Sequence, residues 1–442
     1  MAMESFIVKG GNRLSGEIMV SGAKNVALKA IVAACLTEEK VTISNVPLIS
    51  DFFVMIDIIK ELGGVVEVND HEITVQVKEF KKSTISLDQA AHIRTSSMFL
   101  APLLIRNKSA VIPNPGGCRI GARPIDMTLQ GLIQMGADID YRSNDGFFHA
   151  TAGKLQGITY RFNKNTHTGT ETMIIAAVLA AGKTRLENAA LEPEIDELIQ
   201  LLNSMGAKIK RSEKRVIEIE GVEKLHGAQF TIEPDRNEVV TFAIAAYVTK
   251  GDVFIKGAKS SSLAEFLLKL DAIGAKYEVG DEGIRFYDDQ PLVGTSIATA
   301  AHPGFMTDWQ APWAVLMTQA EGESIIHETV FSNRFGYVTE LRKMGAKILF
   351  IDPKVENPTE TYNFNTDEQS TAPRAVAITG PIQLHDAVVS ISDLRAGASL
   401  VLAALAANGE TVIHGVNLVD RGYEAFEERL RSLGATIKRV NE

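Results

Sequence analysis

The segment Pro113–Asp126, PNPGGCRIGARPID, holds the side chains that most suggest covalent chemistry. Its glycines and prolines prevent a regular helix, so we expect an exposed loop. Arg119 and Arg123 lie close to Cys118, and neighbouring cations stabilise a thiolate and lower the pKa of a thiol. A passive loop cysteine is the alternative. Cys35, within the apolar run AIVAACL, is expected to be a small buried hydrophobe instead.

Two further segments place charged side chains where helices are expected to begin. Ser21–Asn25, SGAKN, combines a glycine turn with Lys24 before an apolar run, an arrangement that suits an anion. The P-loop spacing is absent, and an ordinary strand-to-helix turn is the alternative. Asp308, in MTDWQ, could act as a general base toward a hydroxyl group. It could equally be the N-cap of the helix that follows.

Three arginines lie beside turns or apolar helices: Arg334, Arg395 and Arg421. Each could be a surface ion-pair partner that contributes little to stability. If they converged on one site, they would form a clamp for phosphate and carboxylate groups. The sequence shows no zinc-ligand spacing, serine-nucleophile elbow or dinucleotide fingerprint, so we expect neither a metal ion nor an organic cofactor.

Composition narrows the class of protein to a folded globular one. The chain has 442 residues, of which 45% are hydrophobic and 23% charged, and its length suggests two or three domains. Two cysteines cannot form a disulfide framework, so we expect the protein to reside in a reducing cytoplasm. The net charge of −10 argues against nucleic acid as a partner. No apolar run or leader-like segment indicates a membrane span or secretion.

The fold must position these side chains, and internal repetition in the sequence is the main indication of that fold. A short motif with a central glycine recurs six times at intervals of about seventy residues, with a longer last interval. Each copy ends a helical pattern and opens an alternating, strand-like stretch, as expected for glycine just past a helix end. The central glycines are Gly63, Gly136, Gly206, Gly274, Gly345 and Gly434.

Each repeat contains a small apolar helix, a strand, an amphipathic helix and further strands. The apolar helices include Ala30–Leu36, Met173–Ala181 and Leu400–Ala407, and the amphipathic ones include Glu194–Met205 and Gly422–Leu433. Helices that are apolar on all sides must be buried on all sides. We therefore predict an α/β protein of two domains, each with three α+β repeats around buried helices. The long last interval contains a polar stretch, 352–374, expected to be an inserted surface loop.

With these motifs in view, the chain resembles the UDP-N-acetylglucosamine enolpyruvyl transferases of peptidoglycan synthesis. The resemblance covers essentially the whole chain and is most specific in GGCRIGARPID, FMTDWQA, ETVFSNRF and DLRAGASLVLA. It implies an inside-out α/β barrel fold with one domain at 24–233 and the other joining 1–23 to 234–442. Substrates would bind in the cleft between the domains. The small-molecule partners would be phosphoenolpyruvate and UDP-N-acetylglucosamine, with no obligate protein partner, and fosfomycin would modify the cysteine loop.

The resemblance also implies roles for individual residues. Cys118 would be the general acid and Asp308 the base, with Lys24 and Arg395 also in the catalytic set. Phosphoenolpyruvate would be held by Lys24, Asn25, Arg123, Arg334 and Arg421. The UDP-sugar would be held by Asn25, Arg94, Arg123, Pro124, Ile125, Asp126, Met127, Lys164, Thr166, His167, Asp308 and Val330.

Three features depart from the family pattern: Thr128 in place of a usual histidine, the run 165–170, and the insertion 352–374. The first two concern nucleotide recognition rather than chemistry. They leave two alternatives to the transferase itself. One is an enolpyruvyl transferase with another sugar-nucleotide acceptor, and the other is a non-catalytic homologue that only binds sugar nucleotides.

Overall fold

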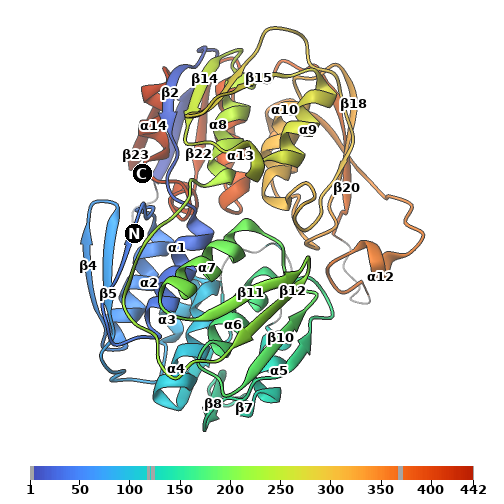
Figure 1. Ribbon diagram of the computed structural model, residues 1–442. Coiled ribbons are helices and arrows are strands. Elements are labelled where there is room, and N and C mark those ends of the chain that lie inside the picture. Colours follow the sequence, from blue (N-terminus) through green and yellow to red (C-terminus); the bar gives the residue numbers. More distant parts are fainter. Residues whose placement is uncertain (1–3, 117–119, 121–124, 367–371, 442) are drawn as a thin grey trace. The chain divides into compact units, whose positions relative to one another are not determined.

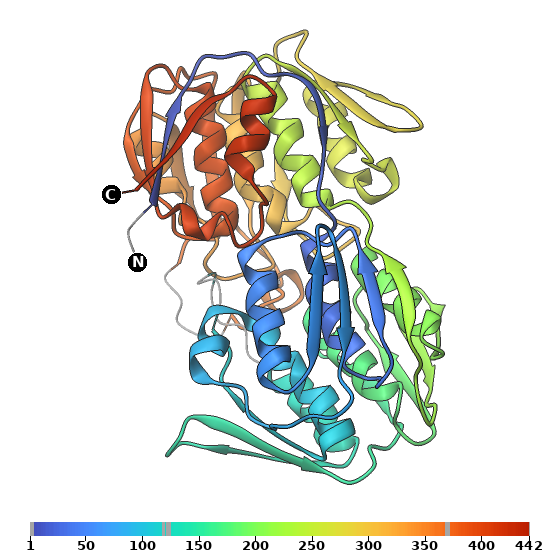
Figure 2. The same ribbon diagram turned by 90° about the vertical axis from the view of Figure 1, so that its left-hand side faces the viewer.

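The computed structural model describes residues 4–116, 120, 125–366 and 372–441. The chain divides into two compact units. The central unit runs from Gly22 to Glu233, and the terminal unit joins the residues up to Ser21 to those from Pro234 onward, with Ile120 also belonging to it. Each unit contains three of the six sheets formed by the described residues, as Figures 1 and 2 show.

The sheets of the central unit have the orders β13-β3-β5-β4, β11-β12-β10-β9 and β6-β8-β7. Their strands are β3 (Val41–Ser44), β4 (Val65–Asn69), β5 (Glu72–Gln76), β6 (Ser109–Pro113), β7 (Ala137–Arg142), β8 (Phe147–Ala152), β9 (Thr159–Arg161), β10 (Lys183–Glu187), β11 (Lys208–Glu213), β12 (Val216–Glu220) and β13 (Ala228–Thr231).

The sheets of the terminal unit have the orders β21-β22-β1-β23, β15-β16-β14-β2 and β17-β18-β20-β19. Their strands are β1 (Glu4–Lys9), β2 (Ser15–Met19), β14 (Asp252–Lys256), β15 (Lys276–Val279), β16 (Gly283–Tyr287), β17 (Ile297–Ala298), β18 (Gly322–His327), β19 (Lys347–Ile351), β20 (Ala375–Gly380), β21 (Val388–Ser390), β22 (Glu410–His414) and β23 (Thr436–Asn441).

The six sheets share one topology. In each, the strand that follows the buried helix pairs antiparallel with a second strand, which in turn pairs antiparallel with a third, as in β10-β12-β11. A parallel edge strand such as β9 flanks the first strand. In the β6 sheet this edge is reduced to a bridge between Thr84 and Val111. The predicted six repeats are confirmed, and among the described strands no sheet closes into a barrel.

Two strands, β2 and β13, each belong to one unit while the helix that follows them in the chain belongs to the other unit. β2 pairs with β14 of the terminal unit, although the chain then continues into a helix of the central unit. Conversely, β13 pairs with β3 of the central unit, and the chain then continues into the terminal unit. The N-terminal strand β1 lies between β22 and β23 and so completes the last repeat.

Apolar helices fill the middle of each unit, and the sheets lie outside them (Figure 1). In the terminal unit α8 (Arg236–Val248), α10 (Gln310–Met317) and α13 (Leu394–Ala406) pack against one another. Every residue of α8 and α10 is buried, including the polar residues Arg236, Asn237 and Glu238 in the first turn of α8. The other helices of this unit are α9 (Ala264–Ile273), α11 (Val338–Lys343), α12 (Pro358–Thr361), α14 (Phe426–Ser432), η2 (Ser260–Ser262), η3 (Thr307–Trp309) and η4 (Val416–Leu418).

The central unit has the same plan. Its buried helices α1 (Lys24–Ala34), α4 (Leu100–Asn107) and α6 (His167–Ala177) form one core with the inner faces of the sheets. The remaining helices are α2 (Ser50–Glu61), α3 (Leu87–His92), η1 (Arg94–Phe99), α5 (Asp126–Gln134) and α7 (Pro193–Ser204). None of the helices in the described ranges has the length and apolarity needed to cross a membrane.

The recurring glycines end the amphipathic helices as predicted. All six central glycines have φ between 80° and 103°, the left-handed region in which glycine meets no Cβ penalty. Two predictions need correction. The helix expected from Gly422 begins at Phe426, because the chain is still turning at Ala425, whose φ is 43°. The insertion 352–374 is also more than a surface loop, since it contains α12 and buries Tyr362 at 1% exposure.

Candidate active site

Asp308 lies in η3 of the terminal unit, where two arginines hold its carboxylate. Nη2 of Arg334 donates to Oδ1 at 2.5 Å, and Nε of Arg395 donates to Oδ2 at 3.3 Å. Both arginine side chains are 5% exposed, whereas the Asp308 side chain is 23% exposed. The group therefore offers an accessible carboxylate backed by two buried cations.

The alternative role of Asp308 as a helix N-cap is wrong. The chain makes a 3-10 turn before α10, so Trp309 rather than Asp308 occupies the N-cap position. Neither η3 nor α10 receives a capping hydrogen bond from a side chain. The Asp308 carboxylate thus pairs with the two arginines and does not cap its own helix.

Arg395 carries the feature that most directly indicates an anionic ligand. Its Nη1 atom is buried and has no hydrogen-bond partner among the described residues. Burial works to lower the pKa of Arg395, but nearby Tyr423 and the carboxylates of Asp308 and Asp235 outweigh it and raise that pKa above its ordinary value. The Arg395 guanidinium is paired with Asp308 through Nε, and its buried Nη1 keeps a donor that a bound anion could accept from.

Asp393 and Arg439 are positioning residues that the motifs did not single out. Asp393 caps α13 by accepting from the backbone N–H of Arg395 at 3.1 Å, and one of its oxygens lies 3.9 Å from Nη1 of Arg334. Arg439 donates to both oxygens of Asp420 at 2.8 and 2.6 Å, and it fixes the turn that contains Arg421. An aspartate before an apolar helix is a recognisable cap signal, whereas nothing in β23 marks Arg439.

In the central unit, the predicted anion-binding turn leads into α1. Gly22 is required there, because a Cβ atom would collide with the carbonyl oxygen of Asn45. The Nζ atom of Lys24 lies 2.8 Å from Oδ2 of Asp51, and both side chains are buried. Asn25 is half-buried on the first turn of the same helix. The turn is therefore an ordered strand-to-helix connection that also presents a lysine and the start of a helix.

Part of the predicted UDP-sugar set lines a polar pocket in the central unit. Of the predicted residues it brings together Arg94, Ile125 and Thr166, and Thr128 also faces it. Ser97, Thr168 and Thr172 add hydroxyl groups that the motifs did not identify. Asn25, Asp126, Met127, Lys164 and His167 do not line this pocket.

His167 instead joins a buried charged group behind the Thr166 and Thr168 wall. Its Nε2 lies 3.2 Å from Oε1 of Glu171, and Nζ of Lys29 lies 3.3 Å from Oε2 of the same carboxylate. Burial acts to lower the pKa of His167, yet Glu171 more than compensates and the pKa is raised. Thr166 also caps α6 by accepting from the N–H of Gly169 at 3.1 Å. The pocket wall at the start of α6 is therefore fixed by charge and by capping.

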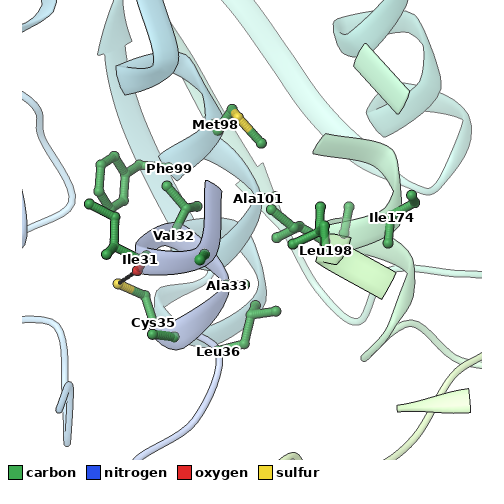
Figure 3. Close-up of a cluster of buried hydrophobic side chains, with 14 of the residues drawn as sticks. Ile31, Val32, Ala33, Cys35, Leu36, Met98, Phe99, Ala101, Ile174 and Leu198 are labelled. Atoms are coloured by element: carbon green, nitrogen blue, oxygen red, sulfur yellow. Dashed lines mark hydrogen bonds between the residues drawn. The ribbon is translucent and has the colours of Figure 1, made fainter. Parts of the chain in front are cut away.

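Three predicted site residues, Cys118, Arg123 and Pro124, lie outside the described residues. Cys35 is described, and it behaves as the sequence predicted. Figure 3 shows it packed among Ile31 and Leu36, with Sγ donating to the carbonyl of Ile31 at 3.3 Å. Burial raises the pKa of Cys35 to about 12, so this thiol stays protonated and unreactive.

The residues that the sequence predicted for the site are divided between the two units. Lys24, Asn25 and the pocket residues belong to the central unit, while Asp308, Val330, Arg334, Arg395 and Arg421 belong to the terminal unit. Within the described ranges no cluster of three or more histidine, cysteine or acidic side chains has an arrangement that could hold a metal ion.

The architecture, with three repeats in each unit, matches that of known enolpyruvyl transferases. The structure is similar to that of the enolpyruvyl transferase NikO from Streptomyces tendae, with a TM-score of 0.87 at 25% identity and full coverage of both chains. EPSP synthase from Acinetobacter baumannii shares the fold, with a TM-score of 0.75 at 18% identity over 99% of this chain and all of that chain.

The sequence comparisons narrow the class further. The family model for EPSP synthase (3-phosphoshikimate 1-carboxyvinyltransferase) matches residues 8–430, so the chain belongs to that family. The UDP-N-acetylglucosamine 1-carboxyvinyltransferase of Acidobacterium capsulatum is 42% identical, covering 99% of this chain and 96% of that protein. The enzyme of the same name from Desulfatibacillum aliphaticivorans is 41% identical, covering 99% and 100%. Within the family, the chain belongs to the group of the UDP-N-acetylglucosamine 1-carboxyvinyltransferases.

Proposed function

We infer that the chain transfers the enolpyruvyl group of phosphoenolpyruvate to the 3′-hydroxyl of UDP-N-acetylglucosamine and releases phosphate. The product is the first committed intermediate of peptidoglycan synthesis. We place the reaction in the cytoplasm, because a chain with only two cysteines suits a reducing compartment. The observation that carries the inference is the Asp308 carboxylate between Arg334 and Arg395, with one buried guanidinium nitrogen still unpaired. Full-length similarity to enzymes with this name supports it.

The reaction needs a base for the sugar hydroxyl, and Asp308 is the proposed one. Its accessible carboxylate would accept the 3′-hydroxyl proton as that oxygen attacks C2 of phosphoenolpyruvate. Cys118 would donate a proton to C3 in the same step, which produces a tetrahedral ketal that still carries phosphate. The Cys118 thiolate then takes a proton back from C3 while phosphate leaves C2 with the proton held by Asp308, which restores the double bond and both side chains. Bonds, protons and charge balance without an oxidant or a cofactor.

The cations would bind the substrate's negative groups and stabilise the charge that develops on them. Arg395 and Arg334 are already buried and oriented by Asp308, so they need little reorganisation when an anion arrives. We assign Lys24, Asn25, Arg123 and Arg421 to the same substrate. The domain boundaries expected from the sequence, 24–233 and the remainder, would give each domain a share of the site.

The acceptor nucleotide is assigned to the polar pocket of the central unit. The start of α6 and the positively charged Arg94 both line this pocket, and both favour a diphosphate ligand. We also keep Pro124, Asp126, Met127, Lys164, His167 and Val330 in the proposed acceptor set. The hydroxyl-rich wall, including Thr128, would supply hydrogen bonds to the nucleoside.

Phosphate release from phosphoenolpyruvate tests the function. We expect release that depends on UDP-N-acetylglucosamine. Release only with another sugar nucleotide would support the altered-acceptor alternative, and no turnover with any acceptor would support the binding-only alternative.

Fosfomycin labelling tests the cysteine assignment separately. We expect covalent labelling of the wild type, read by intact-protein mass, and none in Cys118→Ser. Labelling that survives the substitution, or that maps to Cys35, would overturn the role given to Cys118.

A further inference from the structure

Glu328 is a buried carboxylate at the start of the motif ETVFSNRF, and neither the resemblance nor the proposed chemistry gives it a role. It follows directly on the last residue of β18, His327, and it is 1% exposed. Burying a carboxylate costs free energy unless hydrogen bonds compensate for lost water, so its surroundings should show what it does.

One oxygen of Glu328 holds the turn that contains Asp308. Oε2 accepts from the hydroxyl of Thr307 at 2.9 Å and from the side-chain amide of Gln310 at 3.0 Å. These two residues lie on either side of Asp308–Trp309. This single oxygen therefore holds both ends of the turn that carries Asp308.

The other oxygen holds the segment that leads to Arg334. Oε1 accepts from the backbone N–H groups of Val330 at 2.7 Å and Phe331 at 3.0 Å. Three residues later Arg334 donates to Oδ1 of Asp308. The contacts therefore form a closed ring: Glu328 orients the carboxylate through one oxygen and its arginine partner through the other.

This arrangement needs a carboxylate. Four donors converge on Glu328, and an ionised carboxyl group can accept from all of them, whereas an amide of the same shape must turn an NH₂ group toward some of them. Burial raises the pKa of Glu328, while the N–H groups of Phe331 and Val330, the charge of Arg334 and the hydroxyl of Thr307 work against that rise.

The end of β18 does not depend on Glu328 for its place. Thr329 donates from its backbone N–H to Oγ1 of Thr299 at 2.8 Å. The insertion binds the same point, because Asn363 donates its N–H to the carbonyl of Thr329 at 2.8 Å. His327 lies 3.0 Å from the hydroxyl of Tyr362. Substitution of Glu328 should thus disturb the site more than the fold.

We propose that Glu328 is a positioning residue that sets Asp308 and Arg334 in register for proton abstraction from the acceptor hydroxyl. The proposal rests on the proposed function, and it adds a role for a residue that touches no substrate. Since Glu328 acts through Asp308, its effect should disappear once Asp308 can no longer serve as a base.

The test is a double-mutant cycle in phosphate release, with wild-type turnover measured first so that failure of the proposed function is recognised separately. We expect Glu328→Gln to lower kcat by about 10- to 100-fold, because displacement of a catalytic group by about 1 Å can cost that much. Any rise in KM for phosphoenolpyruvate should be smaller than the fall in kcat, because Arg334 keeps its own contacts with Asp308 and Asp393. The combined Asp308→Asn/Glu328→Gln variant should be no slower than Asp308→Asn alone.

Two further variants keep the test decisive. Glu323→Gln alters an exposed glutamate on β18 itself and should leave kcat unchanged. If Glu328→Gln does not fold, Thr307→Val removes one of the four bonds without changing side-chain shape. It should lower kcat severalfold in the wild-type background and have no effect in Asp308→Asn. Full activity in Glu328→Gln or Thr307→Val, or losses that multiply in the double variants, would overturn the proposal.

Discussion

Replacing Asp308 with asparagine separates its chemical role from its structural one. Asparagine keeps a carbonyl oxygen that can accept from Arg334, but it cannot take a proton from a hydroxyl group. Loss of a general base typically costs 10²- to 10⁴-fold in rate, and at 1.36 kcal/mol per tenfold change this corresponds to roughly 3–5 kcal/mol of transition-state stabilisation.

The effect of Asp308→Asn on the free energy of unfolding should be smaller than its effect on the activation free energy. Removing one partner of a fully buried ion pair costs about 3–5 kcal/mol. Here the Asp308 side chain is 23% exposed, and Asp393 remains 3.9 Å from Arg334 as a second anion. Asparagine also retains one hydrogen bond, so we expect a stability loss of at most about 2 kcal/mol, well below the full cost of a broken buried pair.

The assay compares kcat from phosphate release, UDP-N-acetylglucosamine binding by calorimetry, and the free energy of unfolding in urea. Asp281→Asn, at an exposed position in the same unit, is the matched control and should match the wild type in all three. The reasoning is refuted if Asp308→Asn keeps more than a tenth of wild-type kcat. It is equally refuted if binding and folding are lost together, because the aspartate would then be structural.

Three further predictions concern stability and reactivity. The pKa of His167 is raised in the folded state, so its contribution to stability is complete below the unfolded pKa of about 6.5 and is lost as pH rises through the folded pKa. In urea unfolding, His167→Asn should therefore destabilise the protein more at pH 6 than at pH 9. An equal loss of stability at the two pH values would contradict the pairing of His167 with Glu171. Gly22→Ala should lower the free energy of unfolding by more than about 2 kcal/mol. Gly153→Ala should leave it nearly unchanged, because an added Cβ there meets nothing within 4 Å. Similar unfolding free energies for the two variants would refute the tight approach of Gly22 to Asn45. Native Cys35, whose pKa is raised to about 12, should resist alkylation at pH 8 until the protein is unfolded, and rapid native labelling seen by mass spectrometry would show that it is not buried.

The repeats were predictable because their signals are local. The glycine past a helix end and the alternating strand after it depend only on residues that are close together in the sequence. All six central glycines have positive φ, as this pattern predicts. The wholly apolar segment Ala30–Leu36 could likewise be predicted to lie in the interior, and all of its residues are buried.

What the sequence could not predict depends on contacts between distant segments. β1 completes a sheet with β22 and β23, more than four hundred residues away along the chain, and no local pattern announces such a partner. The Lys24–Asp51 pair joins two helices, and the four donors to Glu328 come from two separate segments. An aspartate before an apolar helix looks the same whether it caps the helix or faces two arginines, as Asp308 does.

The most direct test of the central claim follows the bridging oxygen of phosphoenolpyruvate. With ¹⁸O between C2 and phosphorus, addition at C2 followed by elimination breaks the C2–O bond. All label should appear in the released phosphate, accompanied by an equal amount of enolpyruvyl-UDP-N-acetylglucosamine in the mass spectrum. Label retained on the carbon fragment, or phosphate released without that product, would contradict enolpyruvyl transfer.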